Sequence, residues 1–183
     1  MRIRRTRRND RSIIFITGVI VLIILSLFSE APRRIAETQT LVIEEESLLA
    51  ACIPLQEGQR AEYIRVVDGD TAIFRIEGED RRIRYIGINT PEKGQDYSWD
   101  ATIYNEELLS SAGAIWLYKD VSDTDRYNRL LRYVVVEGKF VNYLLIENGY
   151  AQVMMVSPDV ACADMFLEAQ ETARREKRGL WGK

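Results

Sequence analysis

Residues 63–76 read YIRVVDGDTAIFRI, two apolar stretches joined by the turn Asp68-Gly69-Asp70. Val, Ile, Tyr and Phe dominate both stretches, and an Asp-Gly pair between such stretches is typical of a β-hairpin. We therefore predict strands at 63–67 and 71–76, after which Gly78 turns the chain again. Three further strands are predicted at 82–88, 114–119 and 130–136.

Helices are predicted mainly in the second half of this region. Ala101, Tyr104 and Leu108 have the i, i+3, i+7 spacing of an apolar helix face. A second apolar stripe, 141–149, stops at a glycine, and a third runs through 163–179. Strands that cluster early, with helices interleaved later, predict an α+β fold built on a small mixed barrel.

The composition of the 183-residue chain limits its chemistry. The chain is 46% hydrophobic with a net charge of -3, which allows a packed core and argues against a polybasic binding protein. It contains no histidine, which excludes Ser-His-Asp and Cys-His catalysis and any His-containing zinc site. Two cysteines are too few for a four-cysteine zinc site. An enzyme of this composition must rely on carboxylates, arginines, lysines, tyrosines or a hard metal ion.

The N-terminus has the pattern of a membrane signal. Residues 1–11 hold six arginines against one aspartate, and 12–29 are 18 uncharged, mostly apolar residues. As a helix this stretch would span about 27 Å, close to the thickness of a bilayer core. We predict a basic cytoplasmic segment at 1–11, a hydrophobic helix that acts as a transmembrane signal anchor at 12–29, a tether at 30–56 and a folded domain at 57–183.

Cleavage of this signal is the alternative. Ser29-Glu30-Ala31 fits a small-x-small cleavage site loosely, but Pro32 follows it and should hinder cleavage. The positive-inside rule places the folded domain outside the cytoplasm in either case. The domain is therefore expected to be held at the membrane by a single span, or to be secreted after cleavage.

The two cysteines, Cys52 and Cys162, could pair in an oxidising compartment. A closed loop of this length would stabilise the fold by about 4 to 5 kcal/mol in the chain-entropy estimate. Two separate thiols fit the sequence equally well.

Acidic and amide oxygens gather next to the predicted strands. Asp68 and Asp70 bracket the hairpin turn, and Asn89, Thr90 and Glu92 follow the third strand, which Pro91 prevents from continuing. Such oxygens suit Ca²⁺ far better than zinc. Taken alone, each of these loops also fits an ordinary turn without a ligand.

Two arginines add a second chemical signal. Arg84 lies five residues before Asn89, and Arg129 ends the polar loop 120–129. A guanidinium group offers two parallel donors that match two oxygens of a phosphate. Arginines beside a Ca²⁺ site are the chemistry of a phosphodiesterase.

Three motifs in this order resemble the staphylococcal nuclease family. They are Asp68-Gly69-Asp70-Thr71, the stretch from Arg84 to Glu92, and Asp125-Arg126-Tyr127-Asn128-Arg129. The resemblance covers about residues 60–182, including the end of the last helix and Gly179-Leu180-Trp181. It implies a five-stranded OB-fold-type β-barrel flanked by three α-helices, and a Ca²⁺-dependent nuclease that hydrolyses DNA or RNA.

The resemblance also implies a metal site. Asp70 would ligate Ca²⁺ directly, Asn89 would supply its side-chain oxygen and Thr90 its backbone carbonyl. Asp68 would support the site from behind the ligands.

The same resemblance implies catalytic and substrate-binding roles. Glu92 would activate the attacking water, and Arg84 and Arg129 would hold the scissile phosphate. Tyr127 would line the nucleotide pocket.

The sequence departs from the family pattern at three places. Asn89 stands where well-studied members have an aspartate, which removes a negative charge from the metal site and should weaken Ca²⁺ binding. Asn128 replaces a common glycine and can adopt the left-handed conformation of such a turn. Met154, Met155 and Ser157 occupy a stretch that carries stacking tyrosines in those members, so base affinity should fall.

These departures support an alternative function. A non-catalytic domain that binds nucleic acid or protein would tolerate Asn89 and the missing tyrosines. The retention of Arg84, Glu92 and Arg129 favours the enzyme, because a domain that had lost catalysis would be free to lose them.

Overall fold

The computed structural model describes residues 51–53 and 58–182 of the chain. The predicted segments 1–11 and 12–29, and most of the tether 30–56, lie outside the described residues. Within the described residues, no helix has the length and apolar character needed to cross a membrane.

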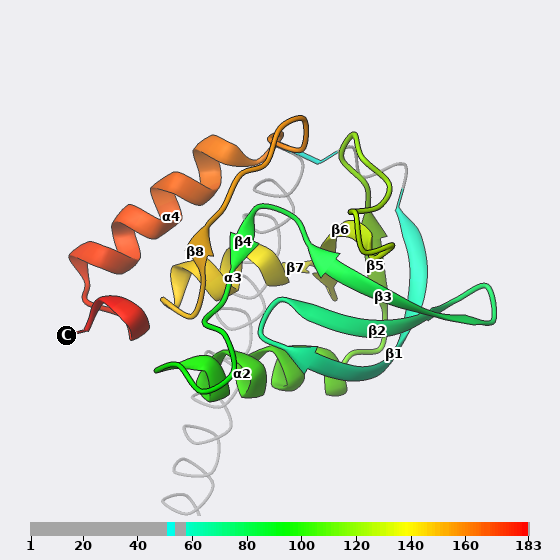
Figure 1. The fold of residues 1–183 in the computed structure, drawn as a ribbon, viewed down its shortest axis with the longest axis horizontal. Helices are drawn as coiled ribbons and strands as arrows, with labels where there is room; N and C mark the ends of the chain where they lie inside the picture. The colour runs from blue at the N-terminus through cyan, green and yellow to red at the C-terminus, as the bar shows by residue number, and fades with distance from the viewer. Residues whose placement is uncertain (1–50, 54–57, 183) are drawn as a thin grey trace, which may run out of the picture. The chain divides into compact units, whose positions relative to one another are not determined.

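Five strands close into a barrel (Figure 1). They follow the order β3-β2-β1-β5-β6, and a parallel pairing of β3 with β6 closes the circle. The strands are β1 (Gln59–Asp68), β2 (Thr71–Ile76), β3 (Glu79–Tyr85), β5 (Ile115–Tyr118) and β6 (Leu130–Val136). The predicted five-stranded barrel is thus confirmed.

The first strand is bent so that it can serve two neighbours. Its register with β2 shifts between Tyr63 and Arg65 and again between Val66 and Asp68, as expected where a strand carries bulges. Its first residues pair with β5 and the remainder pairs with β2, which turns the sheet back on itself. Alternate side chains then point inward and fill the barrel, among them Phe74, which is fully buried.

The third predicted strand, 82–88, is wrong at its end. The barrel strand stops at Tyr85, and Gly87 takes the left-handed φ of 78°. A Cβ at Gly87 would meet the ring of Phe166 at 2.9 Å, so glycine is required for two reasons. Beyond it, β4 (Ile88–Asn89) leaves the barrel and pairs with β8 (Gln152–Val153).

In the described part of the chain, three α-helices flank the barrel, as predicted. They are α2 (Ser98–Ser110), α3 (Val141–Glu147) and α4 (Ala163–Arg175); a short strand, β7 (Lys139–Phe140), precedes α3, and the 3-10 turn η2 (Gly179–Trp181) follows α4. Helix α2 packs on β1, α3 on β6, and α4 on α3 and β8, so α4 lies beside the small β4–β8 sheet (Figure 1). The glycine expected to end α3, Gly149, has a left-handed φ of 74°.

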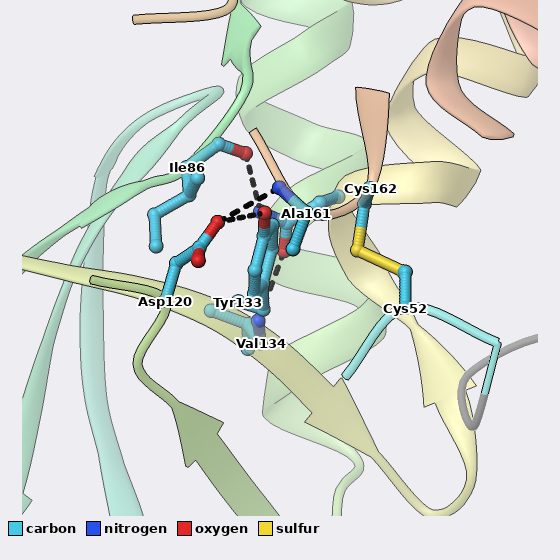
Figure 2. Close-up of a disulfide and its surroundings, with 8 residues drawn as sticks. Cys52, Ile86, Asp120, Tyr133, Val134, Ala161 and Cys162 are labelled. Carbon is cyan, nitrogen blue, oxygen red and sulfur yellow. Dashed lines mark hydrogen bonds between the residues drawn. A yellow bond between two sulfur atoms is a disulfide. The ribbon is translucent and has the colours of Figure 1, made fainter. Parts of the chain in front are cut away.

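The disulfide that the sequence left open is formed between Cys52 and Cys162, with Cα atoms 5.1 Å apart (Figure 2). It joins the chain just ahead of the barrel to the residue before α4. In the same view Asp120 reaches Tyr133 of β6 and Ala161, next to the disulfide.

Candidate active site

The turn between β1 and β2 places a carboxylate inside the protein. Asp70 is only 6% exposed, and its backbone amide donates to the Oδ1 of Asp68 at 3.1 Å. Gly69 lets this turn lie against Thr90 and Ala101, because a Cβ there would come within 2.7 Å of both side chains. The amide of Thr90 donates to the Oδ2 of Asp70 at 2.8 Å. The first and second motifs are therefore brought together by direct contact.

Arg84, from β3, is the counter-charge of Asp70. Its Nη2 lies 3.2 Å from the Oδ2 of Asp70 and donates to the Oδ1 of Asn89, also at 3.2 Å, and its Nη1 donates to the carbonyl of Tyr85 at 2.6 Å. Arg84 therefore connects the oxygen atoms of two residues that the sequence assigned to the metal.

Burial decides the electrostatics of this pair. It raises the pKa of Asp70, while Arg84 and the Thr90 amide act in the opposite direction. It also lowers the pKa of Arg84, while Asp70 opposes that shift. The positive charge of Arg84 thus favours the ionised form of Asp70, and the site holds a desolvated carboxylate that a cation would stabilise.

Asn105, which the sequence analysis did not assign to the site, connects helix α2 to Tyr85 and to the turn that carries Asp68 and Asp70. Asn105 of α2 is fully buried; its Oδ1 accepts the hydroxyl of Tyr85 at 2.9 Å, and its Nδ2 donates to the carbonyl of Asp68 at 3.1 Å. The predicted apolar face of α2 ran through Ala101, Tyr104 and Leu108, whereas its fully buried residues are Ala101, Asn105 and Leu109, at i, i+4, i+8 spacing. A polar residue within such a face indicates a buried hydrogen-bonding role.

Glu92 lies exposed on the loop that follows β4. Its amide donates to the Oε1 of Gln95 at 2.9 Å, and its carbonyl accepts the Gln95 amide at 2.9 Å. This tight turn fixes the backbone of Glu92 and leaves its side chain at the surface.

The loop before β6 is organised around Asp125. One carboxylate oxygen, Oδ1, accepts the amides of Tyr127 and Arg129, both at 2.9 Å, while Oδ2 lies 2.6 Å from both Nε and Nη2 of Arg129. Burial opposes ionisation of Asp125, but these bonds outweigh it and lower its pKa. Asn128 completes the turn with a left-handed φ of 60°. Asp125 belongs to the third sequence motif, but the motif alone does not indicate this role.

Arg84 and Arg129 line one cleft. Asp125 and Asp159 border it as well. Its apolar wall is formed by Ile88 of β4, Leu131 of β6, and Gly87, Met154 and Val156 from the segments next to β4 and β8. The two arginines come from β3 and from the loop ahead of β6, so the fold brings the second and third motifs to one place.

Tyr127 and Glu92 stand apart from this cleft. Tyr127 is 64% exposed, and the guanidinium carbons of Arg126 and Arg129 lie 4.7 and 5.5 Å from its ring centre. Among the described residues, neither Tyr127 nor Glu92 lines the cleft.

The oxygen atoms of Asp70, Asn89 and Thr90 are hard donors of the kind that Ca²⁺ accepts. Only Asp70 contributes a formal charge. Accordingly, no group of three or more His, Cys, Asp or Glu side chains that could hold a metal ion occurs in the described part of the chain.

Comparison with known proteins gives relatives that are named nucleases. The chain is 39% identical over 127 residues to the SPbeta prophage-derived endonuclease YokF and 36% identical over 127 residues to endonuclease YncB, both of Bacillus subtilis, with 65% of this chain covered in each case. It is 30% identical over 129 residues to the thermonuclease of Staphylococcus hyicus, with 67% of this chain and 76% of the relative covered. The matched regions make up only 43% of YokF and 60% of YncB.

The family model described as staphylococcal nuclease homologue matches residues 82–183, more than half of the chain. The matched region begins within β3 and contains the two arginines of the cleft and helices α2, α3 and α4. By its sequence and by the barrel that carries the site, this protein belongs to the staphylococcal nuclease homologues.

Proposed function

We propose that this protein is a Ca²⁺-dependent phosphodiesterase that hydrolyses DNA or RNA. The observation that carries the proposal is the presence of two held guanidinium groups, Arg84 and Arg129, on one cleft. Each is fixed by its own carboxylate, Asp70 or Asp125. Two such groups offer several donors to the non-bridging oxygens of one phosphate, which is stronger and more specific than contact with flexible lysines.

The residues that would hold calcium are Asp70, Asn89 and Thr90. A bound calcium ion would act as a Lewis acid on a phosphate oxygen. Because Asn89 is neutral, we expect weak binding, in a range of about 0.1 to 1 mM that suits extracellular calcium.

The other steps belong to the chain's own residues. As the family resemblance implies, Glu92 would act as the general base and accept a proton from the water that attacks phosphorus, although its exposed side chain does not line the cleft. As the new P–O bond forms and the ester P–O bond breaks, negative charge grows on the phosphoryl oxygens. Arg84 and Arg129 donate hydrogen bonds to these oxygens and so stabilise the transition state more than the ground state.

We also propose that the domain works outside the cytoplasm, held by the predicted anchor 12–29 or secreted after its cleavage. The basic segment before the anchor and the Cys52–Cys162 disulfide support this location, because disulfides persist in oxidising compartments.

The test uses the full chain in detergent with single-stranded DNA, double-stranded DNA and RNA. Calcium is titrated against a chelator for the wild type, Glu92→Gln and Arg129→Ala, with Glu171→Gln as a control for the loss of a surface carboxylate. Cleavage that requires calcium and is lost in the first two variants supports the proposal. Unchanged cleavage in both would refute it.

A binding module is the second candidate, and one observation favours it. Arg84 already contacts the oxygens of both Asp70 and Asn89, so a cation would have to share them. If the folded wild type binds labelled nucleic acid in an anisotropy titration but does not cleave it at saturating calcium, this function replaces the first.

A further inference from the structure

Two loops form facing parts of the cleft. We name residues 120–129 the arginine loop, because it ends in Arg129, and residues 156–161 the wall loop. Arg129 and Asp125 line the cleft from the first loop, and Val156 and Asp159 line it from the second. Both loops lie at the same end of the barrel, ahead of β6 and of α4 respectively (Figure 1).

Each loop sends a carboxylate to the backbone of the other. Asp120 of the arginine loop accepts the amide of Ala161 at 3.0 Å through Oδ2. In return, the Oδ1 of Asp159 in the wall loop accepts the amides of Val121 and Ser122 at 3.0 and 2.7 Å. The two loops are therefore joined by crossed, charge-assisted hydrogen bonds, which are about twice as strong as neutral ones.

Both partners of this cross are fixed to the rest of the fold. Asp120 also accepts the hydroxyl of Tyr133, which lies in β6 (Figure 2). On the other side, Ala161 directly precedes Cys162, which is covalently bonded to Cys52. The cross thus connects the arginine loop to a strand of the barrel and to a disulfide.

The charge of Asp159 is otherwise unexpected. It is a carboxylate, 6% exposed, that borders a cleft proposed to receive an anion. A negative charge there weakens attraction to phosphate, so its presence calls for another role. The two loop amides that it binds supply that role.

We infer that Asp120 and Asp159 are positioning residues that hold the arginine loop so that Arg129 meets the reacting phosphate. This inference rests on the proposed nuclease function. Neither residue touches the phosphate in this role; both act through the backbone that carries Arg129. Since a displacement of about 1 Å can lower a rate about 100-fold, loss of the cross should act mainly on the catalytic step.

The kinetic test compares the full-length wild type with Asp159→Ala and Asp159→Asn. The alanine variant is expected to lose about 10- to 100-fold in kcat with less than about a threefold change in KM. The asparagine variant keeps an oxygen that can accept from the two loop amides, so its kcat should lie within about threefold of the wild-type value. If the negative charge of Asp159 were itself required, the asparagine variant would lose activity as the alanine variant does.

The control is Glu137→Ala. Glu137 makes a carboxylate–amide bond of the same kind, from its Oε1 to the amide of Gly113 at 2.8 Å, but it does not border the cleft. Its kcat should match the wild type. An unchanged kcat in Asp159→Ala, or an equal loss in Glu137→Ala, would overturn the inference.

A second measurement does not depend on cleavage. The amides of Tyr127 and Arg129 bind Asp125 rather than Asp159, so their hydrogen exchange reports whether a loss at Asp159 spreads along the loop. Faster exchange of these two amides in Asp159→Ala supports the inference. Faster exchange confined to Val121 and Ser122 refutes it. An inactive wild type would refute the proposed function alone, and this measurement would still decide the positioning role.

Discussion

Substitutions of Asp125 should have different effects on the stability of the protein and on its activity, because Asp125 binds both the backbone of its own loop and the side chain of Arg129. Asp125 binds two backbone amides with Oδ1 and the guanidinium of Arg129 with Oδ2. Asp125→Ala removes both sets of bonds. Asp125→Asn retains an oxygen that can accept from the two amides. Towards Arg129, however, it presents an uncharged NH₂ group, which cannot form an ion pair with the guanidinium.

The structure sets the magnitude of the two effects. The side chains of Asp125 and Arg129 are 16% and 26% exposed, so water can replace only part of what is lost. With about 1.5 to 3 kcal/mol for a hydrogen bond to a charged group, we expect Asp125→Ala to lower the free energy of unfolding by about 3 to 5 kcal/mol, and Asp125→Asn by about half as much.

Activity should follow a different order from stability. Both variants release Arg129, so kcat/KM should fall by about 100- to 1000-fold in each, the range for losing one preorganised transition-state donor. Urea unfolding gives the stabilities, and an assay for cleavage of DNA and RNA in the presence of calcium gives the rates. Wild-type kcat/KM in Asp125→Asn would refute the idea that the carboxylate fixes Arg129 for catalysis.

The pH dependence of stability supplies an independent check. The pKa of Asp125 is lowered in the folded protein, so its stabilisation is complete above the ordinary carboxyl value of about 3.9 and is lost as the pH falls through the lower, folded value. The free energy of unfolding of Asp125→Asn should therefore decline less steeply than that of the wild type below about pH 4. Parallel curves would contradict this assignment.

Three further predictions concern the frame and the metal. The disulfide Cys52–Cys162 joins residues that are 110 positions apart in the sequence, so its reduction should lower the free energy of unfolding by about 4 to 5 kcal/mol in a urea titration. In the same titration, the variant with both cysteines replaced by alanine should be insensitive to reductant. Tyr85→Phe leaves the buried oxygen of Asn105 without its donor and should cost about 1 to 3 kcal/mol by chemical denaturation; an unchanged midpoint would show that this bond contributes nothing. Asn89→Asp adds a second formal charge and should tighten calcium binding on the order of 10-fold by calorimetry, whereas equal affinities would remove Asn89 from the metal site.

The strands that depend on local pattern could be predicted closely. Residues 71–76 and 130–136 form strands with the predicted bounds, because stretches rich in β-branched and aromatic residues end at turn-forming residues on both sides. The third strand failed at Gly87, since Ile86 and Ile88 continue the apolar pattern through the break. The departure of the chain there depends on its packing against Phe166, far away in the sequence.

The structure brings together some of the residues predicted for the site, while Glu92 and Tyr127 do not line the cleft. The sequence assigned Asp70 to the metal and Arg84 to the phosphate, and in the structure these two side chains form an ion pair. The spacing of the motifs did not reveal that Arg84 also contacts Asn89, because that depends on the bend between β3 and β4. The hydrogen bonds from the amides of residues 121 and 122 to Asp159 join positions 38 and 37 residues apart in the sequence, and no local sequence pattern predicts a contact between such distant positions.

The position of the disulfide has a mechanical consequence. A pull applied between the segment ahead of Cys52 and the end of α4 would pass from Cys52 through the S–S bond to Cys162 and onward. Residues 53–161, which include the whole barrel and every residue assigned to the site, would lie in a covalent loop outside the line of tension. If the domain is held by its N-terminal segment, as proposed, a force on its C-terminal helix would therefore be carried past the barrel without pulling its strands apart.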